Sequence, residues 1–168
     1  MEYTKRMTAA RDNFLAGYNC AQSVLLAFGD VTGLDDDTAA RLASSFGGGM
    51  ARMREVCGAV SGMFMAAGLI FGYGTPEVGD IKARHYAFIR SLADEFKAMY
   101  GSIICRELLA GIETTPGGNP EARTSEYYKK RPCAQYIAAC AGILERHLDE
   151  HTGQSQQILY KTEVNNNA

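Results

Sequence analysis

Four of the five cysteines are predicted to lie in the first turns of four different helices. Backbone N–H groups at the start of a helix have no partner within the helix, and the helix dipole is positive there. Both effects stabilise an anion, so a thiol in this position has a lowered pKa and more thiolate at neutral pH. Thiolate is the form that attacks disulfides and binds metals. The four residues are Cys20, Cys57, Cys105 and Cys133.

The neighbouring residues support these helix starts. Asn19 precedes Cys20 and is a favourable N-cap residue. Pro132 precedes Cys133 and is a residue type favoured at the first helical position. Three arginines lie near two of the cysteines in sequence and could lower the thiol pKa further: Arg52, Arg54 and Arg131.

The first functional hypothesis is a thiol-based redox or sulfur-handling protein. Cys57 is predicted to be the nucleophile with a lowered pKa. Exchange would run through a mixed disulfide with a redox partner protein, a small thiol or another sulfur species. The resolving thiol would be one of the other three, namely Cys20, Cys105 or Cys133. Four cysteines permit three pairings, and the sequence does not choose among them.

Two alternatives remain open at this point. The same four cysteines could hold zinc or an iron–sulfur cluster, although no Cys-x-x-Cys pair is present. The chain could also be a non-catalytic helical interaction module whose cysteines only pack. Cys140 lies two helical turns after Cys133 on the same helix face, so it is predicted to be a core residue.

Composition limits the possible functions. The chain has 168 residues and a formal net charge of −2, which gives no electrostatic reason to expect nucleic-acid binding. Five cysteines are too few for a disulfide scaffold, and the odd count leaves at least one thiol unpaired. The first residues contain no apolar export signal, so a cytoplasmic location is expected.

The hydrophobic periodicity is helical nearly throughout, and no segment alternates with a period of two. It predicts an all-α fold: a single-domain bundle of about six or seven helices in residues 1–150. Residues 151–168 are rich in Gln and Asn and are predicted to form a polar, flexible tail. Residues 111–125 contain two prolines and several glycines and are predicted to form a surface loop. One long helix is predicted after Pro76, with an apolar stripe from Ile81 to Met99.

Residues 56–76 contain no charged residue. The segment is long enough for a membrane span, but its glycines make it only modestly hydrophobic, so a buried central helix is favoured. Gly58, Gly62 and Ala66 are spaced four apart and would let neighbouring helices approach closely. This glycine-rich helix could also form a homodimer contact.

The sequence Cys57-Gly58-Ala59-Val60-Ser61-Gly62 resembles the hallmark of the C_GCAxxG_C_C family, a bacterial family of redox-active proteins. The surrounding pattern is also similar, with Gly17–Gln22 upstream and Phe46–Gly49 before the hallmark. The resemblance extends over roughly residues 10–145. It implies a redox role and four hallmark cysteines, which fall by position on Cys20, Cys57, Cys105 and Cys133.

Overall fold

The computed structural model describes residues 3–76, 79–115 and 117–166, with side chains described up to residue 152. Within these ranges the chain forms nine α-helices and one short 3₁₀ helix, and its only β pairing is an isolated bridge. The all-α prediction is therefore confirmed. The helices are α1 Lys5–Leu15, α2 Cys20–Leu26, α3 Gly29–Thr32, α4 Asp36–Ala43, α5 Gly58–Phe71, α6 Ile81–Tyr100, α7 Cys105–Leu108, α8 Ser125–Lys130 and α9 Cys133–Asn166; η1 is Ser44–Phe46.

Side-chain caps fix where the first helices begin. Asn19 caps α2, and its Oδ1 accepts hydrogen bonds from the N–H groups of Ala21 and Gln22 at 2.9 and 3.0 Å. The Asn19 N–H in turn donates to Gln22 Oε1 at 2.9 Å, which completes a capping box. Asp35 caps α4 in the same manner through Thr38. Cys20 is consequently held as the first residue of α2.

Helix α5 is the most apolar helix of the core, and eight of its residues are buried. Its glycines let α2 lie directly against it. A Cβ atom added at Gly62 would lie 2.5 Å from the carbonyl oxygen of Ala21, which is closer than atoms can approach. A Cβ at Gly58 would lie 3.0 Å from the Cβ of Cys20. The small residues therefore bring the first turn of α5 beside the start of α2.

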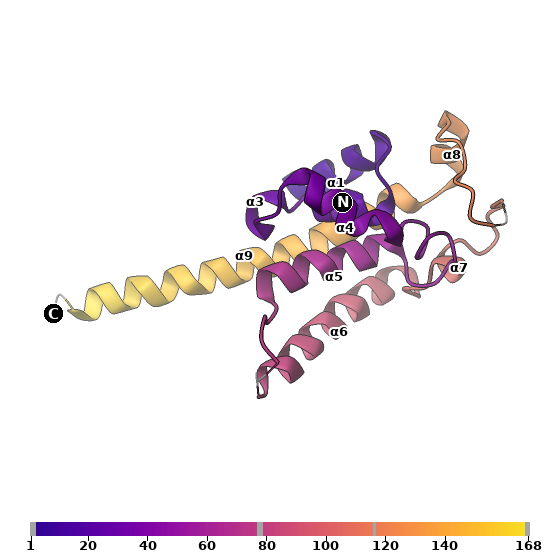
Figure 1. Cartoon of the computed structure of the whole chain (residues 1–168). Helices are drawn as coiled ribbons and strands as arrows, with labels where there is room; N and C mark the ends of the chain where they lie inside the picture. Colours follow the sequence, from indigo (N-terminus) through magenta and orange to yellow (C-terminus); the bar gives the residue numbers. More distant parts are fainter. Residues whose placement is uncertain (1–2, 77–78, 116, 167–168) are drawn as a thin grey trace.

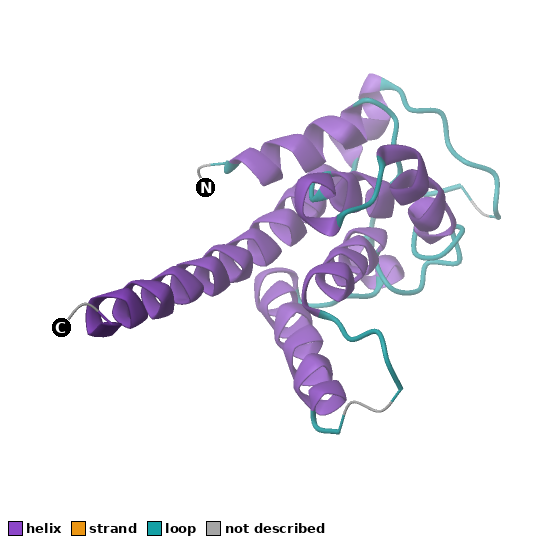
Figure 2. Ribbon diagram, turned by 60° about the vertical axis from the view of Figure 1, so that its left-hand side comes forward, coloured by secondary structure: helices purple, strands orange, loops and turns teal. Residues whose placement is uncertain are grey.

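Helix α9 forms the long axis of the molecule, and α1 and α5 both pack along its first half (Figure 1). Its second half extends beyond the other helices in both ribbon views (Figure 2). The helix thus continues through the segment predicted to be a flexible tail, as far as Asn166. The division into a domain and a tail stays a prediction.

The predicted apolar stripe on α6 is buried only in part. Leu92 and Phe96 are fully buried, whereas Ile81 and Met99 at its ends are more than 40% exposed. In the described part of the chain, no helix is both long enough and apolar enough to span a membrane.

Candidate active site

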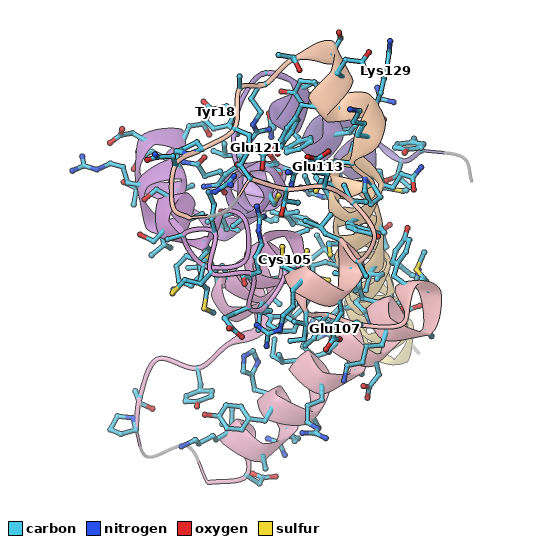
Figure 3. All side chains as sticks on the ribbon, turned by 90° about the vertical axis from the view of Figure 1, so that its right-hand side faces the viewer. Tyr18, Cys105, Glu107, Glu113, Glu121 and Lys129 are labelled. Atoms are coloured by element: carbon cyan, nitrogen blue, oxygen red, sulfur yellow. The ribbon has the colours of Figure 1, made fainter. Side chains whose placement is uncertain are left out.

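A cavity of about 240 Å³ opens at the end of the molecule where α2, α5, α7 and α9 all begin. All four helix-start cysteines line it: Cys20, Cys57, Cys105 and Cys133. Four arginines and one glutamate also line it: Arg52, Arg54, Arg123, Arg131 and Glu121. Figure 3 looks onto this end and shows Glu121 above Cys105, with sulfur atoms gathered beside Cys105.

The predicted placement of the cysteines at helix starts is confirmed. Cys20, Cys105 and Cys133 are the first residues of α2, α7 and α9, and Cys57 is the N-cap of α5. All five cysteines are free thiols. The fifth, Cys140, is fully buried in the core, as predicted.

A short backbone pairing places Cys57 next to Cys105. Val56 and Ile104 form an isolated antiparallel bridge. The N–H of Cys57 donates to the carbonyl oxygen of Ile103 at 2.8 Å, and the N–H of Cys105 donates to that of Glu55 at 2.6 Å. The bridge therefore connects the starts of α5 and α7, and with them two walls of the cavity.

The segment before this bridge winds in the left-handed sense. Five consecutive residues from Gly48 to Arg52 have φ between 47° and 71°, and Arg54 has a φ of 63°. Non-glycine residues rarely adopt this conformation, because it brings Cβ too close to the backbone. At Gly49 a side chain would also collide with Cys105, whose Cβ would lie 2.7 Å away. The turn places Arg52 and Arg54 in the wall of the cavity.

Glu121 joins three of the arginines. Its Oε1 accepts a 2.6 Å bond from Arg131 and a 3.3 Å bond from Arg52, and it lies 3.8 Å from Arg54 Nη2. Burial acts to raise the pKa of Glu121, but the hydrogen bond and charge of Arg131 lower it below its usual value. Arg131 is only 7% exposed, so this carboxylate is the counter-charge that allows its burial.

Cys20 has the most acidic thiol of the site. A hydrogen bond from the Cys133 thiol is the largest influence, and it lowers the pKa of Cys20 from 9.0 to about 7 against the opposing effect of burial. The positive charge of Arg123 and the backbone N–H groups of Gly48 and Cys20 lower it further. Both Cys20 and Cys133 are partly exposed, so solvent reaches this pair.

The other three thiols are held protonated. The hydrogen bond to Cys20 and burial raise the pKa of Cys133 well above its usual value. Burial and the nearby charge of Cys20 raise the pKa of Cys57 to about 12, which differs from the lowered pKa expected of a predicted nucleophile. Burial also raises the pKa of Cys105, even though Arg54 donates to its sulfur at 3.9 Å.

Comparison with known proteins identifies the family. A family model described as "Putative redox-active protein (C_GCAxxG_C_C)" matches residues 18–147, more than three quarters of the chain. The chain belongs to the C_GCAxxG_C_C family. No curated protein and no solved structure matches it. The matched range contains all four cysteines of the cavity, so membership and geometry concern the same residues.

The cavity of this C_GCAxxG_C_C protein does not have the geometry of a metal site. Within the described residues, no three His, Cys, Asp or Glu side chains are arranged to hold a metal ion. The cysteines are engaged separately, since Cys20 pairs with Cys133 and Cys105 faces Arg54. Guanidinium groups in the cavity also repel a cation. The arrangement therefore gives no support to the zinc or iron–sulfur alternative, which stays a prediction.

Two residues of the site were not predicted from the sequence. Glu121 and Arg123 come from residues 111–125, which were predicted to be only a surface loop. The loop instead closes over the cavity, because Arg52 Nη2 donates to the carbonyl oxygen of Thr115 at 2.8 Å and its Nε to that of Gly117 at 3.1 Å. The only local signal is the presence of charged residues within a loop rich in proline and glycine.

Proposed function

We propose that this protein carries out thiol–disulfide exchange, with Cys20 as the attacking thiolate and Cys133 as the resolving thiol. The single observation that carries the proposal is that both thiols line the same cavity, together with four arginines. A pKa of about 7 leaves roughly half of Cys20 as thiolate at neutral pH, which is near the optimum for an attacking thiol.

The reaction is a two-electron exchange. The Cys20 thiolate attacks one sulfur of a substrate disulfide, a mixed disulfide forms, and the other substrate sulfur leaves as a thiolate. Cys133 then loses its proton to the departing thiolate and attacks the Cys20 sulfur. The second substrate thiol leaves, the substrate is reduced, and Cys20 and Cys133 are oxidised to a disulfide.

The position of Cys133 supports the resolving role. Its pKa is raised while that of Cys20 is lowered, and the interaction between the two side chains is the largest cause of both shifts. Cys133 is therefore a poorer nucleophile than Cys20 for the first attack on the substrate. It is placed for the second attack, which breaks the mixed disulfide on Cys20. Cys57 and Cys105 line the same cavity and remain thiols, which suits them to shaping the site rather than to the first attack.

The test uses the reduced full-length protein and a neutral small disulfide, bis(2-hydroxyethyl) disulfide, followed by mass spectrometry of the intact protein and its peptides. The native protein should form the Cys20–Cys133 disulfide. Cys133→Ser should stop at a mixed disulfide on Cys20, and Cys20→Ser should react at least about tenfold more slowly. Cys140→Ala is the matched control, because its thiol is buried in the core and does not line the cavity.

Two results would overturn the proposal. One is first attack at Cys57 with Cys20→Ser as fast as the native protein. The other is stoichiometric iron or zinc, bound through these cysteines, in protein purified without oxygen. The second result would establish the metal alternative in place of exchange.

A further inference from the structure

We infer that the substrate of this site is a small disulfide that carries a negative charge close to its sulfur atoms. The inference rests on the proposed exchange function and adds the chemical class of the substrate. It follows from the charge, the unsatisfied hydrogen-bond donors and the size of the cavity.

The cavity has more positive charge than its one carboxylate neutralises. It contains four arginines but one carboxylate, that of Glu121. Glu121 bonds directly to Arg52 and Arg131, and its distance to Arg54 is 3.8 Å. In the part of the chain that the structure describes, no carboxylate pairs with Arg123.

Two of the arginines also have unused donors. Arg54 Nη2 and Arg123 Nη1 are both shielded from solvent and have no hydrogen-bond partner. A buried guanidinium donor without an acceptor is costly, so an acceptor on a bound ligand would complete the site. Arg123 is held in place by its other nitrogen, which donates to the carbonyl oxygen of Tyr18, and by stacking over Phe14 and Tyr127.

These donors lie near different thiols of the cavity. Arg123 is close enough to Cys20 for its charge to lower the pKa of that thiol, and Arg54 donates to the sulfur of Cys105. An anionic group of a disulfide bound by the Arg123 guanidinium would place the S–S bond close to Cys20, and Arg54 offers a second donor in the same cavity. The same charges would stabilise the thiolate that leaves.

The size of the cavity limits the ligand. Its volume of about 240 Å³ is below the roughly 300–1,000 Å³ typical of sites for drug-sized molecules. A folded protein or a long peptide would need a groove, so the substrate is a compact molecule. Carboxylate and sulfonate groups both supply suitable acceptors, and the experiment distinguishes them.

The experiment compares the rates at which four disulfides oxidise the reduced native protein. They are 3,3′-dithiodipropionate, 2,2′-dithiodiethanesulfonate, neutral bis(2-hydroxyethyl) disulfide and cationic cystamine. Each rate is divided by that disulfide's rate with 2-mercaptoethanol, which removes differences in intrinsic reactivity. At least one anionic disulfide should be favoured over the neutral one by about tenfold and over cystamine by more, and the preference should fall as salt is added.

Variants of the cavity arginines test whether the preference for anionic disulfides arises in the cavity. Arg54→Gln and Arg123→Gln should each reduce it several-fold at about pH 8.5, where Cys20 is ionised in either case. Arg123→Lys, which retains the positive charge, should keep part of the preference for anionic disulfides. Arg41→Gln is the matched control, because Arg41 is exposed on α4 and pairs only with Asp37. The salt dependence of the native protein tests the inference even if a variant does not fold.

The outcomes separate the two proposals. Equal normalised rates for all four disulfides would overturn the inference and leave thiol exchange intact. The same holds if the anionic preference survives unchanged in both Arg54→Gln and Arg123→Gln. If none of the disulfides reacts faster with Cys20 than with an ordinary thiol, the proposed exchange function fails, and the inference fails with it.

Discussion

Cys20 and Cys57 both lie at a helix start, yet their thiols differ widely in acidity. The backbone N–H groups of Ala59 and Val60 act to lower the pKa of Cys57, as expected for a helix start. Burial raises this pKa by more than they lower it. Cys20 is favoured because Cys133 donates a hydrogen bond to its sulfur and Arg123 adds a positive charge. A helix start therefore selects candidates for an acidic thiol, and tertiary contacts decide which of them ionises.

The pH dependence of alkylation tests this assignment. The rate of iodoacetamide modification at Cys20, measured by peptide mass spectrometry, should rise with pH and reach half its maximum near pH 7, because only the thiolate reacts. Cys57 should stay unmodified in the native protein up to pH 9, because burial holds it protonated.

Arg123→Gln provides the matching prediction. Loss of the positive charge destabilises the Cys20 thiolate, so the midpoint should move upward by about one pH unit. Arg41→Gln should leave the midpoint where it is. A midpoint of 8.5 or above in the native protein would contradict the assignment of Cys20 as the acidic thiol.

The sequence alone was sufficient to select the four cysteines, because helix starts are encoded locally. Asn19 and Pro132 lie next to their cysteines, and their effect needs no distant contact. The order of the thiols by pKa could not be predicted from local sequence. It depends on Arg123, which lies more than 100 residues from Cys20 in the chain and reaches it only after folding.

At the scale of elements, the contact between α2 and α5 holds Cys20 against the cavity. Gly62→Ala should lower the free energy of unfolding by about 1–3 kcal/mol, because its Cβ would overlap the carbonyl oxygen of Ala21. Gly68→Ala in the same helix has open space around it and should be neutral or stabilising by up to about 1 kcal/mol. Urea unfolding of both variants measures the difference, and equal effects would show that the close contact is not needed.

Because of the left-handed turn, replacing alanine by glycine should change the stability in opposite directions at two positions. Ala51 has a φ of 47° and is exposed, so Ala51→Gly should stabilise the fold by roughly 0.5–1 kcal/mol through relief of strain. Ala40 lies inside α4, and Ala40→Gly should destabilise by a similar amount. Urea unfolding checks both. Destabilisation by Ala51→Gly would show that the turn is not strained at that position.

The elements differ in how far the sequence predicts them. The packing of the glycine-rich α5 was predicted from the spacing of Gly58 and Gly62, since small residues one turn apart act by size alone. The left-handed conformation of Met50, Ala51 and Arg52 was not predicted, because these residues have no intrinsic preference for positive φ. It is held by surrounding bonds such as that from the Ala51 N–H to the Ser45 carbonyl oxygen at 2.8 Å.

At the scale of the whole molecule, the cavity collects residues from distant parts of the chain. The start of α2, the start of α9 and the loop between α7 and α8 all contribute charged or thiol groups. The proposed reactive pair, Cys20 and Cys133, comes together only when the fold is complete. This explains why no short Cys-x-x-Cys motif marks the site, although both cysteines line one cavity.

Cys20 and Cys133 are far apart in the sequence, so a disulfide between them would also stabilise the fold. A cross-link between them would close a loop of about 110 residues and reduce the entropy of the unfolded chain by an amount worth about 4–5 kcal/mol. The oxidised protein should therefore melt roughly 10–15 °C higher than the reduced one, as measured by circular dichroism with and without dithiothreitol. Cys133→Ser should melt at the same temperature under both conditions. Resistance to heat would then report the redox state of the molecule.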